Sequence, residues 1–178
     1  NYYLGKRRKQ RESILRSLKK HAASYPAMIL TPLPFGMSQF STWPQSFEQD
    51  LQLYQESGIQ YIEVCEGKLE VDNPHPQLQR LRETGLKVPS VQPRLHSLFP
   101  DHPRPLPESP GERMLQLRNS INLFGPYFPG TTIVTITGAA PGGNYDLAYR
   151  TAVNEYKEAA RAAADQGVRL ALEPLNPI

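Results

Sequence analysis

The chain of 178 residues has one cysteine, one tryptophan and no apolar run of the roughly 20 residues that a membrane span needs. Because Cys65 has no second cysteine, an internal disulfide and a cysteine-based zinc site are excluded. No stretch has the pattern of a signal peptide. With 39% hydrophobic residues the chain can bury one core, so we expect a cytoplasmic protein that does not contact a membrane.

The small net charge of +3 conceals an uneven distribution of charge. Residues 1–20 carry eight Lys or Arg and one Glu, whereas the remaining chain is net acidic. Apolar residues recur at helical spacing through this basic segment, so we interpret residues 1–24 as a helix with a solvated basic face, followed by one domain over residues 25–178. Apart from Tyr2 and Tyr3 no aromatic residues are interleaved with the charges, which disfavours nucleic-acid binding.

From Tyr25 onward, strand and helix patterns alternate. Ser46 is expected to cap a helix that ends at Gly58, and Ser109 with Glu112 has the spacing of a capping box. The helix before Gly167 shows an apolar stripe made of Tyr149, Val153, Tyr156, Ala160 and Ala163. Strands are expected at residues 27–31, 59–65, 86–95, 131–137 and 168–172.

Strict alternation of strands and helices predicts parallel pairing through right-handed crossovers. Such a sheet is either open, with helices on both faces, or closed into a barrel. The glycines that end helices, from Gly58 to Gly167, mark units of about 36 residues, and eight of these match the size of a (β/α)8 barrel. No Gly-x-Gly-x-x-Gly follows the first expected strand, which disfavours a dinucleotide-binding open sheet. Strand order separates the two architectures, because a flavodoxin-type sheet has the order 2-1-3-4-5.

Glu173 directly follows the fifth expected strand, where α/β enzymes place metal ligands and acid/base groups. Alternation along this strand is expected to bury Leu170 and Leu172 against the helices and to turn Ala171 and Glu173 inward. A carboxylate inside a barrel is costly unless it meets a cation or hydrogen-bond donors. A salt-bridged or frayed terminal glutamate is the alternative interpretation of this residue.

Four segments together resemble the sugar phosphate isomerase/epimerase family with xylose-isomerase-like TIM barrels. They are GIQYIEVCEGKL, VQPRLHSLFPD, IVTITGAAPGGN and RLALEPLNPI, and the first five βα units fit in order. The resemblance implies an α/β fold of (β/α)8 TIM-barrel type, incomplete here at strands 1–5 of 8. It also implies that Glu173 binds a divalent metal and shares in proton transfer. The family's other three metal ligands lie on strands six to eight and have no counterpart in this sequence.

The implied reaction is a metal-dependent isomerisation or epimerisation of a sugar or sugar phosphate through an enediolate. A divalent metal stabilises such an anion while a carboxylate moves the proton. Oxygen-rich ligation suits Mg²⁺ or Mn²⁺, and histidine among the ligands also admits Co²⁺ or Zn²⁺. One ligand cannot fill an octahedral site, so the 178-residue chain alone is expected to hold no tight metal. A related dehydratase on the same scaffold is the nearest variant of this function.

Other candidate site residues follow the earlier strands. Glu63 and His96 are candidate catalytic groups, and the alternatives are a buried structural carboxylate and a hydrogen-bonded loop histidine. Glu66 and Asn176 are candidates for substrate binding. Gly138 begins a glycine-rich loop before a helix and could let a phosphate approach the backbone, although such turns are common without a ligand.

Two further functions stay open. An apurinic-site endonuclease of the same fold would need a cluster of metal-binding histidines on the strands, and only His96 ends a strand here. A non-catalytic half-barrel could instead assemble with a partner, or with copies of itself as a homo-oligomer, through its open edges. The leading expectation is a small-molecule sugar substrate.

Overall fold

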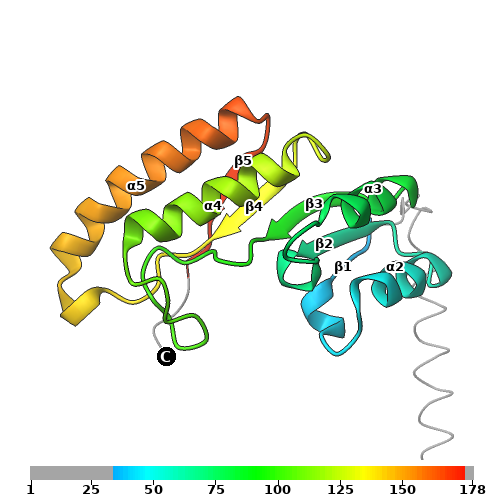
Figure 1. Cartoon of the computed structure of the whole chain (residues 1–178), viewed down its shortest axis with the longest axis horizontal. Helices are drawn as coiled ribbons and strands as arrows, with labels where there is room; N and C mark the ends of the chain where they lie inside the picture. The colour runs from blue at the N-terminus through cyan, green and yellow to red at the C-terminus, as the bar shows by residue number, and fades with distance from the viewer. Residues whose placement is uncertain (1–33, 175–178) are drawn as a thin grey trace, which may run out of the picture. The chain divides into compact units, whose positions relative to one another are not determined.

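The structure is a computed structural model that describes residues 34–174. Its centre is one parallel sheet with the strand order β1-β2-β3-β4-β5 (Figure 1). The strands are β1 (Gly36–Ser38), β2 (Tyr61–Cys65), β3 (Lys87–Gln92), β4 (Thr132–Thr135) and β5 (Arg169–Leu172). This sequential order confirms the barrel-type prediction and rules out the flavodoxin-type order. Within the described residues β1 and β5 each pair with one neighbour, so the sheet has two open edges.

The connections between the strands are four α-helices and three short 3-10 helices. The α-helices are α2 (Phe47–Glu56), α3 (His75–Glu83), α4 (Pro110–Phe124) and α5 (Tyr145–Asp165). The 3-10 helices are η1 (Gln39–Thr42), η2 (Glu66–Lys68) and η3 (Pro141–Gly143). No helix within residues 34–174 is both long and apolar enough to cross a membrane.

The predicted basic helix at residues 1–24 and the strand predicted at residues 27–31 lie outside the described residues. The first strand that the structure describes is Gly36–Ser38, where no strand was predicted. The division of the chain at residue 24 therefore stays a prediction.

Two helix starts differ in how completely they are capped. At α2 the Ser46 hydroxyl accepts from the Gln49 backbone N–H, and the Gln49 side chain accepts from the Ser46 N–H, which completes a capping box. At α4 the Ser109 hydroxyl accepts from the Glu112 N–H, but the structure shows no return bond from the Glu112 side chain. The capping box predicted at Ser109 is therefore only half formed, whereas Ser46 forms the complete one.

The hydrophobic core lies between the sheet and its covering helices. Ile62, Val91 and Ile133 of the strands are fully buried, and they belong to one cluster with the inward faces of α3, α4 and α5. Helices α4 and α5 contact each other beside β4 and β5 (Figure 1). Burial of this apolar surface, at about 25 cal/mol per Å², is the main force that holds the layers together.

The predicted apolar stripe of α5 is only partly buried. Of the predicted residues Ala163 lies in the core, but Tyr149 and Val153 are 72% and 49% exposed. Ala160 is also exposed, and its neighbour Ala159 is buried instead. Leu172, predicted to be buried against the helices, is 54% exposed and lines a groove together with these α5 residues. The prediction was wrong at these positions because no described element covers the outer side of β5 and the first half of α5.

Gly138 should be the glycine least tolerant of a side chain. Its φ is +76°, and an added Cβ would lie 2.7 Å from the Phe99 carbonyl oxygen. We expect Gly138→Ala to lower the free energy of unfolding by about 1–3 kcal/mol more than Gly142→Ala. Gly142 is the matched control because its φ is +57° and its added Cβ meets nothing within 4 Å. Urea denaturation of both variants measures the difference, and equal losses would contradict the close contact.

Candidate active site

A cavity of about 540 Å³ lies at the carboxyl ends of the strands. All five strands contribute to it: its lining includes Phe40 after β1, Cys65 of β2, Gln92 of β3, Ile136 after β4 and Glu173 after β5. The carboxyl ends of parallel strands are where α/β barrels bind ligands. The other lining residues are Trp43, Gly67, Pro93, Arg94, His96, Pro103 and Arg104.

Glu173 is placed by an extension of β5 beyond its last residue. Its backbone N–H donates to the Thr135 carbonyl over 2.8 Å, which adds one more rung to the β4–β5 ladder. Its side chain is exposed and lines the cavity. Within residues 34–174 no hydrogen bond or ion pair reaches its carboxylate. This carboxylate is therefore available to a ligand.

His96 is held in the same cavity by its own backbone. Its carbonyl accepts from the Thr135 hydroxyl over 2.6 Å and from the Ile136 N–H over 2.8 Å. His96 is buried, with only 8% of the residue exposed. The structure thus brings together Glu173 and His96, two of the predicted catalytic residues, although 77 positions separate them in the sequence.

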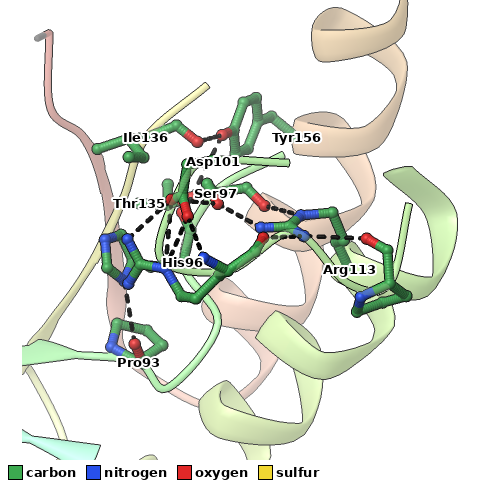
Figure 2. A network of polar contacts seen from close by, with 10 residues as sticks. Pro93, His96, Ser97, Asp101, Arg113, Thr135, Ile136 and Tyr156 are labelled. Atoms are coloured by element: carbon green, nitrogen blue, oxygen red, sulfur yellow. Dashed lines mark hydrogen bonds and ion pairs between the residues drawn. The ribbon is translucent and has the colours of Figure 1, made fainter. Parts of the chain in front are cut away.

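The imidazole of His96 has two competing partners for one nitrogen (Figure 2). Nδ1 lies 3.1 Å from the Pro93 carbonyl oxygen and 2.9 Å from Arg104 Nη1. A carbonyl only accepts and a guanidinium only donates, so the two bonds require opposite tautomers. Donation to Pro93 leaves Nε2 with a lone pair, and acceptance from Arg104 leaves Nε2 with a proton to donate. Burial, followed by the charge of Arg104, lowers the pKa of His96, so the ring is neutral at pH 7.

A buried arginine supports this part of the cavity from α4 (Figure 2). Arg113 is fully buried, and its Nε donates to the Ser97 carbonyl over 2.8 Å while its Nη2 donates to the Ser97 hydroxyl. Its Nη1 donates to the carbonyls of Pro107 and Arg104 over 2.9 and 3.1 Å. Every group of this guanidinium therefore has a partner in the segment between His96 and α4.

Ser97 connects Arg113 to an ion pair at the cavity wall. Its hydroxyl donates to Asp101 Oδ2 over 3.0 Å, and Asp101 pairs with Arg104 at 2.8 Å. Burial raises the pKa of Asp101, but the hydrogen bonds and charge of Arg104 outweigh it and hold that pKa below its ordinary value. Arg104 in turn contacts His96. The network therefore runs from the core of α4 to the imidazole.

These supporting residues were not identified from the sequence. Arg113 carried a usable signal, since it lies four positions before Leu117 on the apolar face of α4 and so is a charge at a core position. Phe40, Trp43, Asp101 and Arg104 lie in connecting segments without periodicity. Their common location follows only from the order of the strands.

The other predicted site residues lie elsewhere. Glu63 accepts from the Ser90 hydroxyl over 3.1 Å and does not line the cavity. Glu66 accepts from the Ser120 hydroxyl over 2.6 Å and from the Arg94 N–H over 2.9 Å, which ties η2 to α4 and to the end of β3. Gly138 lines the separate apolar groove beside α5. Asn176 lies outside the described residues.

The described residues do not by themselves complete a metal site. In residues 34–174 no group of three or more His, Cys, Asp and Glu side chains is placed to hold a metal ion. Glu173 offers an unpaired carboxylate and His96 a nitrogen, so this part of the chain supplies at most two ligands. Any further ligands would come from outside it.

Residues 51–177 match the family model described as the xylose isomerase-like TIM barrel. The chain belongs to this family. No curated protein matches the chain. Its family membership and its sequential parallel sheet agree on a TIM-barrel-type α/β fold, of which the described residues form five strands.

Solved structures support the same fold. Protein SMc04130 from Sinorhizobium meliloti 1021 is 19% identical with a TM-score of 0.62, over 82% of this chain and 52% of that one. The probable 3-DHS dehydratase AsbF from Bacillus anthracis, involved in petrobactin synthesis, is 16% identical with a TM-score of 0.57, over 79% and 52%. IolI, solved with a bound zinc atom, is 15% identical with a TM-score of 0.52, over 77% and 50%. The chain therefore spans about half the length of these proteins.

The low pKa of His96 predicts how stability changes with pH. As the pH falls below the ordinary histidine pKa of about 6.5, the unfolded chain takes up a proton on this residue before the folded chain does, so stability rises with pH through this range. We expect His96→Gln to flatten that rise. Urea denaturation at a series of pH values measures it, with the exposed-site variant His102→Gln as the control. An unchanged slope in His96→Gln would contradict the prediction.

Proposed function

We propose that this chain provides the first five βα units of a metal-dependent sugar or sugar-phosphate isomerase or epimerase. The observation that carries the proposal is the shared cavity of Glu173 and His96 at the carboxyl ends of the strands. Membership of the xylose isomerase-like family supports it. The chain covers about half of its solved relatives, so the activity belongs to the complete barrel.

The proposed reaction removes a proton from the carbon beside a carbonyl and returns it to the same or the neighbouring carbon, through an enediolate. Glu173 is the proposed base, since its carboxylate faces the cavity without a partner among residues 34–174. His96 is neutral, and with Arg104 bonded to Nδ1 its Nε2–H donates to a substrate oxygen. These two groups thus act on carbon and on oxygen respectively.

A divalent metal, Mn²⁺, Mg²⁺, Co²⁺ or Zn²⁺, would supply electrostatic stabilisation of the developing negative charge. Glu173 is the residue of this chain that we assign to hold it. The zinc atom in the IolI structure supports the presence of a metal in a related fold. The described residues alone do not fit a complete site, so the full set of ligands requires the rest of the barrel.

The endonuclease alternative has less support from the cavity. Among the histidines in residues 34–174 only His96 lines it, whereas that chemistry would need a histidine cluster. A half-barrel that assembles with a partner keeps one supporting observation, the open edges at β1 and β5. Assays of ketose turnover and of abasic DNA cleavage, with and without metal, discriminate among the three functions.

Glu173→Gln tests the proposed base and ligand directly. In the complete protein we expect this isosteric change to abolish metal-stimulated turnover on a panel of ketoses and ketose phosphates, and to reduce bound metal, with a melting temperature within a few degrees of wild type. The matched control is Glu158→Gln, which removes an exposed carboxylate on α5 that pairs with Arg161. Wild-type turnover and metal content in Glu173→Gln would refute the assignment.

A further inference from the structure

The two ring nitrogens of His96 differ in what surrounds them. Nδ1 lies within hydrogen-bond distance of two groups, Arg104 Nη1 at 2.9 Å and the Pro93 carbonyl oxygen at 3.1 Å. Nε2 has no hydrogen bond to any residue from 34 to 174, yet it is not one of the fully enclosed polar atoms without a partner in that range. Because His96 lines the cavity, Nε2 is the ring atom that a ligand can reach.

The partner of Nδ1 decides what Nε2 can do. A neutral imidazole carries one proton, on one nitrogen or on the other. If Nδ1 donates to the Pro93 carbonyl, Nε2 presents a lone pair, which binds a metal ion or accepts a hydrogen bond. If Nδ1 accepts from Arg104, the proton sits on Nε2, which then donates to a ligand oxygen. The choice between these two bonds therefore sets the chemical role of His96.

Arg104 is held in place by its side chain and by its backbone. Its Nη2 donates to Asp101 Oδ2 over 2.8 Å, and its Nε lies 3.2 Å from both oxygens of the same carboxylate. Its backbone N–H donates to Asp101 Oδ1 over 2.9 Å, and its carbonyl accepts from Arg113 Nη1 over 3.1 Å. The remaining nitrogen, Nη1, faces His96. The guanidinium therefore cannot turn away from His96 without breaking its ion pair.

The bond from Arg104 is the stronger of the two at Nδ1. It is shorter, and a hydrogen bond from a charged donor is about twice as strong as one between neutral groups. A guanidinium has no acceptor atom, so a proton on Nδ1 would face an N–H of a cation at this distance. Pro93 lines the cavity, where water or a ligand hydroxyl can donate to its carbonyl instead.

We propose that Arg104 is a positioning residue that holds His96 in the Nε2–H tautomer, so that His96 donates to a substrate oxygen and does not bind the metal. The inference rests on the proposed function for the identity of the substrate, and adds to it the residue that sets the tautomer. Ser97 and Arg113 support Asp101 from the side of α4 (Figure 2), so the tautomer depends on contacts that begin in the core.

Nitrogen NMR measures the tautomer directly, because protonated and unprotonated ring nitrogens have well-separated ¹⁵N shifts. The complete protein is labelled with ¹⁵N-histidine and measured at about pH 8, above the ordinary histidine pKa of about 6.5. The spectrum of His96→Gln identifies the signals of His96 among the four histidines of the chain. In the wild-type protein we expect the Nε2–H form of His96 to exceed the Nδ1–H form by at least about tenfold.

Substitution of Arg104 should reverse this ratio. Arg104→Met keeps an extended side chain but removes the donor, so we expect the Nδ1–H form, bonded to Pro93, to become the majority. The matched control is Arg94→Met, which removes another arginine of the cavity lining whose Nη2 donates to the carbonyls of Glu66 and Leu69. It should keep the wild-type ratio. Circular dichroism verifies folding, and Arg104→Ala replaces Arg104→Met if the latter does not fold.

Turnover provides a second readout. On a panel of ketoses, Arg104→Met should lower kcat/KM at least about tenfold, because a lone pair on Nε2 then faces the substrate oxygen in place of a hydrogen-bond donor. Wild-type kcat/KM in a variant with the reversed tautomer would refute the role of Nε2–H in the reaction.

The NMR result separates this inference from the proposed function. If the protein turns over no ketose, the isomerase proposal fails, while a ratio that reverses only in the Arg104 variant still supports control of the tautomer. That control is overturned by a majority of Nδ1–H in the wild-type protein or by a majority of Nε2–H that persists in Arg104→Met. A reversal in Arg94→Met would also overturn it, because the ratio would then follow the general charge of the cavity.

Discussion

A fully buried arginine, Arg113, holds the irregular segment between β3 and α4, and one wall of the cavity belongs to that segment. Removing a charge from water costs several kcal/mol, so such a residue persists only where its hydrogen bonds compensate. Here Arg113 makes four hydrogen bonds to Ser97, Arg104 and Pro107. Of the carbonyls that accept them, that of Arg104 also accepts from the Asp101 N–H at 3.4 Å. Leaving the carbonyls of Ser97 and Pro107 unpaired would cost about 1–3 kcal/mol each. The arginine and the segment therefore stabilise each other.

The stacked pair Phe40 and Trp43, which follows β1 at the other edge of the sheet, is also supported by a buried polar network. Lys68 and Asp50 form an ion pair with 5% and 0% side-chain exposure, and Gln39 links Asp50 to β2. Asp50 Oδ1 has no partner in the described residues, so this carboxylate is satisfied on one oxygen only. A hydrocarbon core could hold α2 and β2 together, but it could not bond to the Thr42 carbonyl, which Lys68 does. The polar network therefore fixes the end of η1 in place, in addition to joining α2 to β2.

The sequence predicted elements whose signals are local. Ser46, Gly58 and the apolar runs located α2 and strands β2 to β5, and the end of β5 located Glu173, because capping and alternation depend on near neighbours. Prediction from the sequence failed where a residue's position depends on contacts with residues that are distant in the chain. Arg113 binds a segment that begins 16 positions earlier in the sequence. Phe40 and Trp43 line one cavity together with residues from the ends of β3 and β5, which are distant in the sequence. Leu172 and Tyr149 were predicted on apolar, buried faces but are exposed, because no described element covers them.

The two networks also determine which charge the cavity presents. Asp101 pairs with Arg104 and Asp50 pairs with Lys68. Arg94, which also lines the cavity, donates instead from Nη2 to the carbonyls of Glu66 and Leu69. Glu173 has no ion-pair partner within residues 34–174. A carboxylate that lines a cleft and has no cationic partner attracts a cation to that cleft. The ion pairs of the two networks are thus internally balanced, and the groups left to act on a ligand are Glu173 and the neutral His96 that lines the same cavity.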